Sequence, residues 1–154
     1  MLTIRRFQKG DEEILSVMIR RTLREVNYTS PKSELDYLIP HYSPETMVEL
    51  SETGHTYVLE EDGQIIGSGT VLPDGETEAE IVAAFLSPES IGKGYARKLF
   101  ETLETDELAA KATRVCLTSS DMALGFYEHM GWVNPNGPRA RAGEDNLLYM
   151  EKRK

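Results

Sequence analysis

The sequence predicts a single α/β (α+β) domain in which a mixed, mostly antiparallel central sheet carries helices on both faces. Extended segments joined by short turns fill the middle of the chain, from residue 55 to residue 86, as in antiparallel hairpins. A helical segment then separates the extended segments 78–86 and 114–118, which is the order of a parallel crossover. At 154 residues, the chain is expected to form one domain, residues 1–154, with one sizeable core.

The first third of the chain is expected to contain an edge strand and two helices. Residues 2–7 alternate loosely and predict the strand, and apolar side chains then recur at helical spacing from Asp11, the expected N-cap. Residues 28–42 are expected to be irregular or briefly helical. Ser43-Pro44-Glu45 predicts the start of a helix that ends near Glu52. Four aromatic side chains between the two helices can line a substrate pocket or simply pack over the core: Tyr28, Tyr37, His41 and Tyr42.

The middle of the chain predicts a meander of three strands. Asp62-Gly63 is a strong hairpin-turn signal, and Gly67 and Gly69 indicate either the close approach of a neighbour or a bulge. Residues 81–86 are too continuously apolar for a strand with one wet face, so we expect that strand to be covered on both sides. The expected strands cover residues 55–60, 65–72 and about 78–86.

The last third predicts two helices and three strands. Apolar side chains at positions 96, 99, 100 and 103 form one face of a helix. A cap cluster, Ser119-Ser120-Asp121, opens a second helix, and Gly131 ends it. The expected elements are a helix over 94–112, a strand over 114–118, a helix over about 122–130, a strand from Trp132-Val133, and a closing strand over 146–150 before a basic tail.

Composition excludes several classes of protein. A net charge of −9 argues against nucleic acid and anionic membranes as partners, and is compatible with attraction of a cationic amine. No apolar run approaches the ~20 residues of a membrane span, and the N-terminus lacks a signal peptide, so a soluble, cytoplasmic protein is expected. The single cysteine, Cys116, is expected to be a small buried residue, and the three histidines lack ligand spacing, so no metal site is expected.

The stretch from Glu80 to Leu103 predicts an anion site. It contains a strand, a turn with two glycines, and a helix N-terminus, whose free N–H groups and dipole attract phosphate. A nucleotide P-loop would need Ser or Thr after Lys93, where Gly94 stands, and a dinucleotide fingerprint would need a third glycine at Arg97. Neither of these nucleotide sites is therefore indicated.

Two motifs resemble the hallmarks of the GNAT N-acetyltransferase superfamily. In the acetyl-CoA signature Gln/Arg-x-x-Gly-x-Gly/Ala, Gly94 and Ala96 match, whereas Ile91 departs from the Gln/Arg position. In the second hallmark, Asn-x-x-Ala-x-x-Phe-Tyr-x-x-x-Gly-Phe, Ser120 replaces the asparagine and Trp132 stands for the last aromatic residue. The matching positions of the second hallmark are Ala123, Phe126, Tyr127 and Gly131. The resemblance covers residues 2–150 and implies a GNAT-type sheet.

The resemblance implies that acetyl-CoA, as cosubstrate, lies where the strand 80–87 separates from the strand 114–118. Phe85, Leu86 and Ser87 would offer main-chain groups to the pantetheine, and an N–H near Phe85 or Leu86 would polarise the thioester carbonyl. Ser120 would contact the pantetheine arm. The residues implied to bind the pyrophosphate, or to add positive charge there, are Gly92, Lys93, Gly94, Tyr95, Ala96, Arg97 and Lys98.

The resemblance also suggests two catalytic residues. Tyr127 is the expected general acid for the leaving thiolate, with mere orientation of the sulfur as the alternative role. Glu80 is the expected general base, since strand alternation would put it on the face of Val82, Ala84 and Leu86. Glu78 could act instead through water, or both acids could simply attract a cationic substrate.

The expected activity is transfer of acetyl from acetyl-CoA to a primary amine of a small molecule or peptide, by direct attack in a ternary complex. The alternative is a non-catalytic acyl-CoA-binding sensor or regulatory module. The resemblance is also compatible with a homodimer. The acceptor is not specified, because residues 28–50 and 133–146 carry no diagnostic motif.

Overall fold

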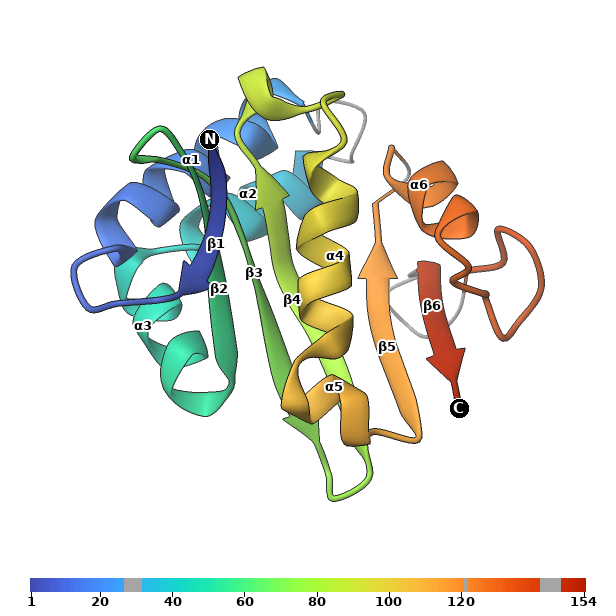
Figure 1. The fold of residues 1–154 in the computed structure, drawn as a ribbon. Helices are drawn as coiled ribbons and strands as arrows, with labels where there is room; N and C mark the ends of the chain where they lie inside the picture. The colour runs from blue at the N-terminus through green and yellow to red at the C-terminus, as the bar shows by residue number, and fades with distance from the viewer. Residues whose placement is uncertain (27–31, 121, 142–147) are drawn as a thin grey trace.

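The computed structural model describes residues 1–26, 32–120, 122–141 and 148–154. Within these residues, one six-stranded sheet runs in the order β1-β2-β3-β4-β5-β6 (Figure 1). Neighbouring strands are antiparallel, except that β4 and β5 are parallel. The strands are β1 (Leu2–Arg6), β2 (His55–Glu61), β3 (Gln64–Asp74), β4 (Glu78–Leu86), β5 (Arg114–Ser119) and β6 (Leu148–Arg153).

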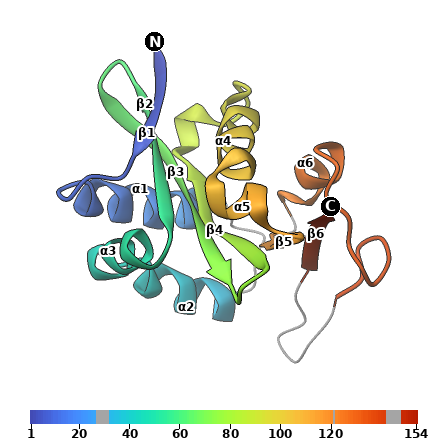
Figure 2. The ribbon, with the colours of Figure 1, turned by 60° about the horizontal axis from the view of Figure 1, so that its bottom comes forward.

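Helices cover both faces of this sheet. The first three helices lie on one face, and α4 and α5 lie on the other (Figure 2). The helices are α1 (Glu12–Glu25), α2 (Lys32–His41), α3 (Pro44–Thr53), the short 3-10 turn η1 (Pro88–Ser90), α4 (Tyr95–Thr105), α5 (Glu107–Lys111) and α6 (Leu124–His129). The predicted mixed, mostly antiparallel sheet with helices on both faces is therefore confirmed.

Each face has its own apolar core. Leu15, Ile19 and Leu23 of α1 pack with Met47 of α3 and Val58 of β2 on the first face. On the second face, the buried stripe of α4 packs with side chains of β3, β4 and β5: Leu99, Phe100, Leu103, Val71, Ile81 and Val115. The sheet thus positions its strand ends between two independently packed layers of helices.

Gly69 allows α4 to lie close to the sheet. A Cβ at this position would lie 2.7 Å from Leu103 Cδ1, well inside normal contact. The expected close approach at this glycine is therefore present. The hairpin turn is also confirmed, since Asp62 and Gly63 both have positive φ, 52° and 84°, as a type I′ turn requires.

A bulge in β4 lies across from this glycine. The β3–β4 ladder pairs Ser68 with Phe85, and its next pair joins Thr70 to Val82. One residue therefore intervenes in β3 and two intervene in β4. Ala83, with a φ of +53°, is in the left-handed region that alanine rarely adopts. The extra residue shifts the alternation of side chains, so each residue of β4 after the bulge points to the opposite face of the sheet from the one that regular alternation would give.

Several elements in the first half differ from expectation. Residues 32–41 form a ten-residue helix, α2, although it contains Pro40 and buries no side chain. Asp11 stands at the N-cap of α1, but its carboxylate accepts from Arg5 at 2.8 and 3.0 Å and from the Gln8 N–H at 2.8 Å instead of capping the helix. Tyr28, which the sequence placed with the other aromatic residues, lies outside the described residues.

The second half contains three further corrections. The helix expected over 94–112 breaks at Asp106, whose ψ of 148° is extended, and resumes as α5. Val133 makes only an isolated bridge to Glu151, so no strand starts there. The basic tail belongs to β6, which continues to Arg153. Asp121 and residues 146–147, parts of the expected cap cluster and closing strand, lie outside the described residues.

Candidate functional site

The parallel pair β4–β5 is joined only at its beginning. Its register comprises Glu78–Arg114, Ala79–Val115 and Glu80–Cys116. Beyond Glu80, β4 continues to Leu86 alongside β3, and β5 continues alongside β6. The two strands end at the same edge of the sheet, where α4 begins and α6 lies (Figure 1). The structure therefore brings together the strand end, the glycine turn and the helix of Tyr127 that the sequence singled out.

The bulge decides which side chains face each other across this edge. Ile81 and Leu86 pack in the same core, on the α4 face, although five positions separate them. Phe85 packs instead against the α1–α3 core. Glu80 alternates with Ile81 and so faces α1–α3. The expectation that Glu80 shares a face with Ala84 and Leu86 is wrong, because the extra residue at Ala83 reverses the alternation.

The main-chain groups at the end of β4 are mostly engaged. The Ser87 N–H donates to Ile66 O at 2.7 Å, and Ser87 O accepts from the Ser90 N–H at 2.9 Å. Leu86 O accepts from the Thr22 hydroxyl at 2.8 Å. Since successive residues of an antiparallel strand point their amides to alternate sides, the Leu86 N–H is directed away from β3. Of the three residues expected here, Leu86 thus supplies the free donor.

The glycine turn has the properties of an anion site. Gly92 and Gly94 have φ values of 86° and 82°, and a Cβ at either position would meet nothing within 4 Å. Gly94 is the N-cap of α4, whose first turn contains no acidic side chain. Arg97 and Lys98 stand in that turn and are exposed, as is Lys93 before it. Positive side chains at the positive end of a helix are unfavourable unless an anion lies there, so the turn fits a pyrophosphate.

Two other predicted residues of this turn have side chains directed elsewhere. The Tyr95 hydroxyl donates to Glu61 in β2, so only the main chain of Tyr95 remains for the turn. Ala96 is half-buried and packs against the α4-face core.

Tyr127 lies in α6 and is almost fully buried, with 8 % of its surface exposed. Its ring packs edge-on against Phe100 of α4, with ring centroids 5.2 Å apart, and against Trp132 at 6.3 Å. Burial raises the pKa of the Tyr127 phenol above its usual value of 10.0. Ser120 precedes this helix, and its hydroxyl accepts from the Ala123 N–H at 3.2 Å, which fixes the turn into α6.

Glu80 is half-buried on the opposite face. Burial, and secondarily the charge of Asp74, raise the pKa of the Glu80 carboxyl above 4.5. Tyr42 lies near it, and burial, together with Tyr37 and Glu80, raises the pKa of Tyr42 to about 12. A raised carboxyl pKa makes Glu80 a better proton acceptor near neutral pH than an exposed acid.

The aromatic side chains of α2 and the following turn lead toward this carboxylate. The Tyr37 and His41 rings stack with centroids 5.6 Å apart, and His41 meets Tyr42 edge-on at 5.0 Å. Tyr42 in turn meets Phe85 of β4 edge-on at 5.4 Å. The series therefore extends from exposed Tyr37 to the bulged strand. This is the arrangement expected of a substrate-lining segment, although packing over the core contributes to it as well.

Glu78 is held differently from Glu80. Its carboxylate lies 2.7 Å from the Arg114 guanidinium, which also contacts Glu151 at 3.4 Å. This ion pair leaves Glu78 less available as a base than Glu80.

Sequence reasoning missed Thr22. It is 3 % exposed and bonds to the end of β4 from α1. The signal was present, because Thr22 stands on the buried stripe of α1, four residues after Met18 and beside Leu23. A polar side chain on such a stripe needs a buried partner.

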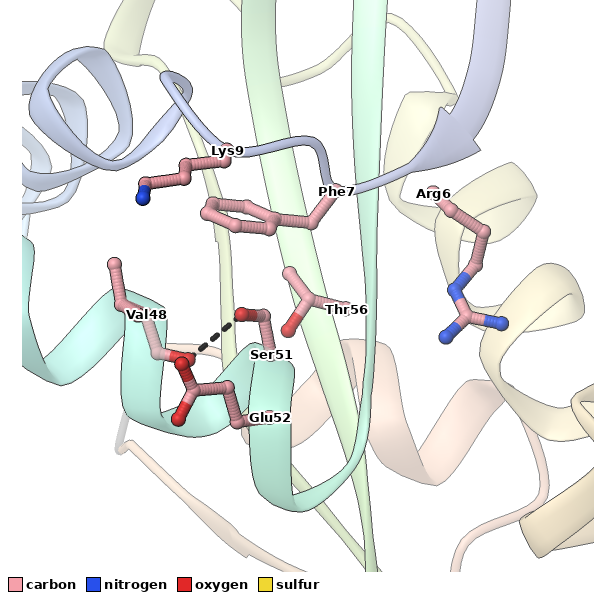
Figure 3. Close-up of a pocket in the computed structure, with 7 residues that line it drawn as sticks. All are labelled: Arg6, Phe7, Lys9, Val48, Ser51, Glu52 and Thr56. Carbon is pink, nitrogen blue, oxygen red and sulfur yellow. Dashed lines mark hydrogen bonds between the residues drawn. The ribbon is translucent and has the colours of Figure 1, made fainter.

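A separate pocket of about 330 Å³ lies two strands away from this edge (Figure 3). It is formed by β1, the following turn, α3 and β2, and none of the predicted site residues lines it. Figure 3 shows Arg6 directed away from the other six labelled side chains. The hydroxyl of Ser51, which lines this pocket, already donates a hydrogen bond to Val48 O at 2.7 Å.

Within the residues that the structure describes, no group of three or more His, Cys, Asp or Glu side chains is arranged to hold a metal ion. No helix in the same part of the chain has the length and apolar character needed to cross a membrane.

Comparisons with known proteins agree with this geometry. The model of the acetyltransferase (GNAT) domain matches residues 28–154. The uncharacterized N-acetyltransferase YjgM of Escherichia coli (strain K12) is 25 % identical over 138 residues, which cover 84 % of this chain and 80 % of YjgM.

Solved structures share the fold. The PaiA N-acetyltransferase of Thermoplasma acidophilum, crystallised with coenzyme A, aligns with a TM-score of 0.81 at 18 % identity, over 100 % of this chain and 99 % of PaiA. The N-acetylglutamate synthase of Neisseria gonorrhoeae, complexed with coenzyme A and N-acetyl-glutamate, aligns with a TM-score of 0.67 at 18 % identity, over 99 % of this chain and 35 % of the synthase. The family model covers most of the chain, and the chain belongs to the GNAT acetyltransferase family, as an N-acetyltransferase.

Proposed function

We propose that this N-acetyltransferase is a single domain that moves acetyl from acetyl-CoA to a primary amine of a small molecule or peptide, by direct attack in a ternary complex. The observation that carries the proposal is the end of β4. There, an unpaired strand edge leads into two left-handed glycines and a helix whose first turn is basic. The coenzyme A in the related PaiA and N-acetylglutamate synthase structures supports acetyl-CoA as cosubstrate.

The main chain would bind and polarise the thioester. The N–H groups from Gly92 to Arg97 would hold the pyrophosphate, with Lys93 and Lys98 adding positive charge. The Leu86 N–H, directed to the unpaired side of β4, would donate to the thioester carbonyl oxygen as negative charge develops there. The Leu86 carbonyl and both Ser87 main-chain groups would instead keep this strand end rigid.

Two side chains on opposite faces would handle the protons. Glu80, facing α1–α3, would accept a proton from the amine, directly or through water, while the amine nitrogen bonds to the carbonyl carbon. The carbon–sulfur bond would then break, and the thiolate would receive a proton from the Tyr127 phenol. The amine would approach along the aromatic series that ends at Tyr42 and Phe85.

The raised pKa of Tyr127 constrains its role. Burial keeps the phenol protonated at neutral pH, which a general acid needs. A phenol of ordinary pKa is already a weaker acid than a thiol of pKa about 8.5, and the shift widens this difference, so full transfer to the thiolate is uphill unless the developing charge is stabilised. We therefore expect the Tyr127 phenol at least to donate a hydrogen bond to the sulfur in the transition state. Complete transfer of its proton to the sulfur requires that the charge on the phenolate be stabilised.

Steady-state kinetics test the proposal. The protein would be incubated with acetyl-CoA and each of a panel of amines, and the reaction would be monitored through release of the coenzyme A thiol. The acetylated product would be identified by its mass. We expect amine-dependent release, with initial-rate lines that intersect when both substrates are varied. Parallel lines with an acetylated enzyme would replace direct attack by a two-step route. Absence of release and of calorimetric coenzyme A binding would overturn the proposal.

A further inference from the structure

Helix α1 reaches the candidate site through one buried hydroxyl. The Thr22 side chain is 3 % exposed, and its Oγ1 donates to Leu86 O at 2.8 Å. The same oxygen lies 2.9 Å from Met18 O, four residues back in α1. A threonine inside a helix commonly bonds to its own helix at this spacing. The hydroxyl has a single proton, so the bond to Leu86, 64 positions away, shares that proton with Met18 O instead of adding a second full bond.

The bond from Thr22 completes a clamp on one peptide unit. The Leu86–Ser87 peptide presents its N–H to Ile66 O at 2.7 Å and its carbonyl to Thr22. The β4–β5 ladder ends at Glu80–Cys116, so β5 supplies no donor to this carbonyl. Its hydrogen bond comes instead from a helix on the opposite side of the chain from α4. The peptide is thereby held by β3 on one side and by α1 on the other.

The clamped peptide stands between the two functional parts of the site. On its N-terminal side is the Leu86 N–H, the donor assigned to the thioester carbonyl. On its C-terminal side, Ser87 begins the turn to Gly92, and the Ser87 and Ser90 hydroxyls lie 2.7 Å apart. Rotation of this peptide would redirect both parts together. A donor that must point at a developing charge loses much of its effect when it is free to turn.

Arg21, the neighbour of Thr22, makes a second link to the same turn, through an ion pair with Glu89 in η1. Both side chains of this pair are substantially exposed, at 43 % and 61 %, so water screens it and its contribution is small. The buried bond of Thr22 is the stronger of the two links.

We propose that Thr22 is a positioning residue for acetyl transfer. It fixes the Leu86–Ser87 peptide and so aims the Leu86 N–H and anchors the glycine turn. The inference rests on the proposed function. It gives α1, whose apolar side chains pack in the core of the α1–α3 face, a part in positioning the residues that act on the thioester. A purely structural role would lower stability without a specific effect on turnover.

The experiment compares three full-length variants. Thr22→Val removes the hydroxyl and keeps the shape, and Thr22→Ser keeps the hydroxyl. The matched control is Thr56→Val, which removes a hydroxyl of similar burial (1 % exposed) that bonds to Thr70 at 2.8 Å; the ladder partner of Thr70 in β4 is Val82, four residues before Leu86. Each variant is measured by hydrogen exchange of the segment 84–91 and by kcat and KM for acetyl-CoA with the preferred amine.

For Thr22→Val we expect faster exchange in this segment and a fall in kcat of about 10-fold, with a smaller change in KM. Thr22→Ser should retain kcat to within about 3-fold, and Thr56→Val should match wild type in both measurements even though it is destabilised. Unchanged exchange in Thr22→Val, or a kcat loss no larger than that of Thr56→Val, would overturn the inference. If the wild-type protein shows no amine-dependent turnover, the proposed function is overturned, and with it the catalytic part of this inference. The exchange data would still show whether Thr22 holds the Leu86–Ser87 peptide.

Discussion

Glu80 pairs with Cys116 at the last position where β4 and β5 form a ladder. The carboxylate that we propose as the base therefore stands where the parallel strands part. Its face is that of α1–α3, whereas Tyr127 is packed on the face of α4. A thioester lying in the unpaired region beyond this pair would have an acid on one side and a base on the other.

Replacement of Tyr127 by phenylalanine tests the acid. Tyr127→Phe keeps the ring contact with Phe100 and removes the phenol, so kcat should fall by about 10²-fold while coenzyme A affinity changes less than about 2-fold. Initial rates and calorimetry measure the two quantities. Tyr149→Phe, a change to a more exposed phenol on β6, is the control and should leave both values near wild type. An unchanged kcat in Tyr127→Phe would refute the proton-donor role.

Replacement of Glu80 by glutamine tests the base. Glu80→Gln should lower kcat/KM at neutral pH by about 10²-fold and remove the acidic limb of the pH–rate profile. On the proposed mechanism, that limb in the wild type reflects deprotonation of Glu80. Because burial and Asp74 raise the pKa of Glu80, the midpoint should lie above 4.5. Glu76→Gln, which removes an exposed charge near the start of β4, is the control. Should Glu78→Gln instead abolish the limb, the base would be Glu78.

The same substitution has an expected effect on stability. Because folding raises the pKa of Glu80, the folded state favours the protonated carboxyl. This contribution to stability is present below the unfolded pKa and is lost as pH rises through the folded pKa. Glutamine is neutral throughout, so Glu80→Gln should be at least as stable as wild type at pH 7, by urea denaturation. Lower stability would mean that the carboxylate has a partner that stabilises it.

The glycine turn can be tested with a matched pair of substitutions. Gly94→Ala and Gly75→Ala both place a Cβ in open space at similar φ, 82° and 69°, so both strain the backbone to a similar degree. We expect Gly94→Ala to weaken coenzyme A binding by about 10-fold, because the strain shifts the N-cap of α4, and Gly75→Ala to leave it unchanged. Calorimetry measures both dissociation constants. Equal affinities would place the pyrophosphate elsewhere.

His55 and Asp106 provide a test of the fold away from the site. The Asp106 side chain is 1 % exposed, and both its oxygens lie 2.7 Å from His55 Nδ1. His55→Ala would leave this carboxylate without that partner and should cost about 2 kcal/mol in urea denaturation, with kcat little changed. Lys111→Ala, which breaks an exposed pair with Glu107, should leave the midpoint unchanged. Equal midpoints for both variants would show that the His55–Asp106 contact is not stabilising.

Much of the fold was predictable because its signals are local. Helix α3 begins at Ser43, whose hydroxyl accepts from the Thr46 N–H at 3.2 Å as a serine cap should. The Asp62-Gly63 turn and the αL glycines of residues 92–94 likewise follow from residue type alone. The Asp106 break between α4 and α5 was missed because the helical apolar pattern does not mark it; at the break, the Asp106 carboxylate contacts His55, 51 positions earlier.

The candidate site was predictable in location but not in orientation. Gly67 signalled an irregularity that β3 does have, at the neighbouring Ile66, whereas the bulge that orients the site lies in β4, at Ala83, which has no sequence signal. That one residue decided which core receives Phe85 and Leu86. The contribution of Thr22 depends on a bond across 64 positions, which helical periodicity does not contain.

Three paired positions, together with the bond from the Thr113 N–H to Thr77 O, form a short main-chain seam between the four-stranded part of the sheet and the antiparallel pair β5–β6. A molecule lodged beyond that seam touches both parts and therefore stabilises their union by mass action. On the proposed function that molecule is acetyl-CoA, so the resistance of this protein to proteases should rise with the concentration of acetyl-CoA.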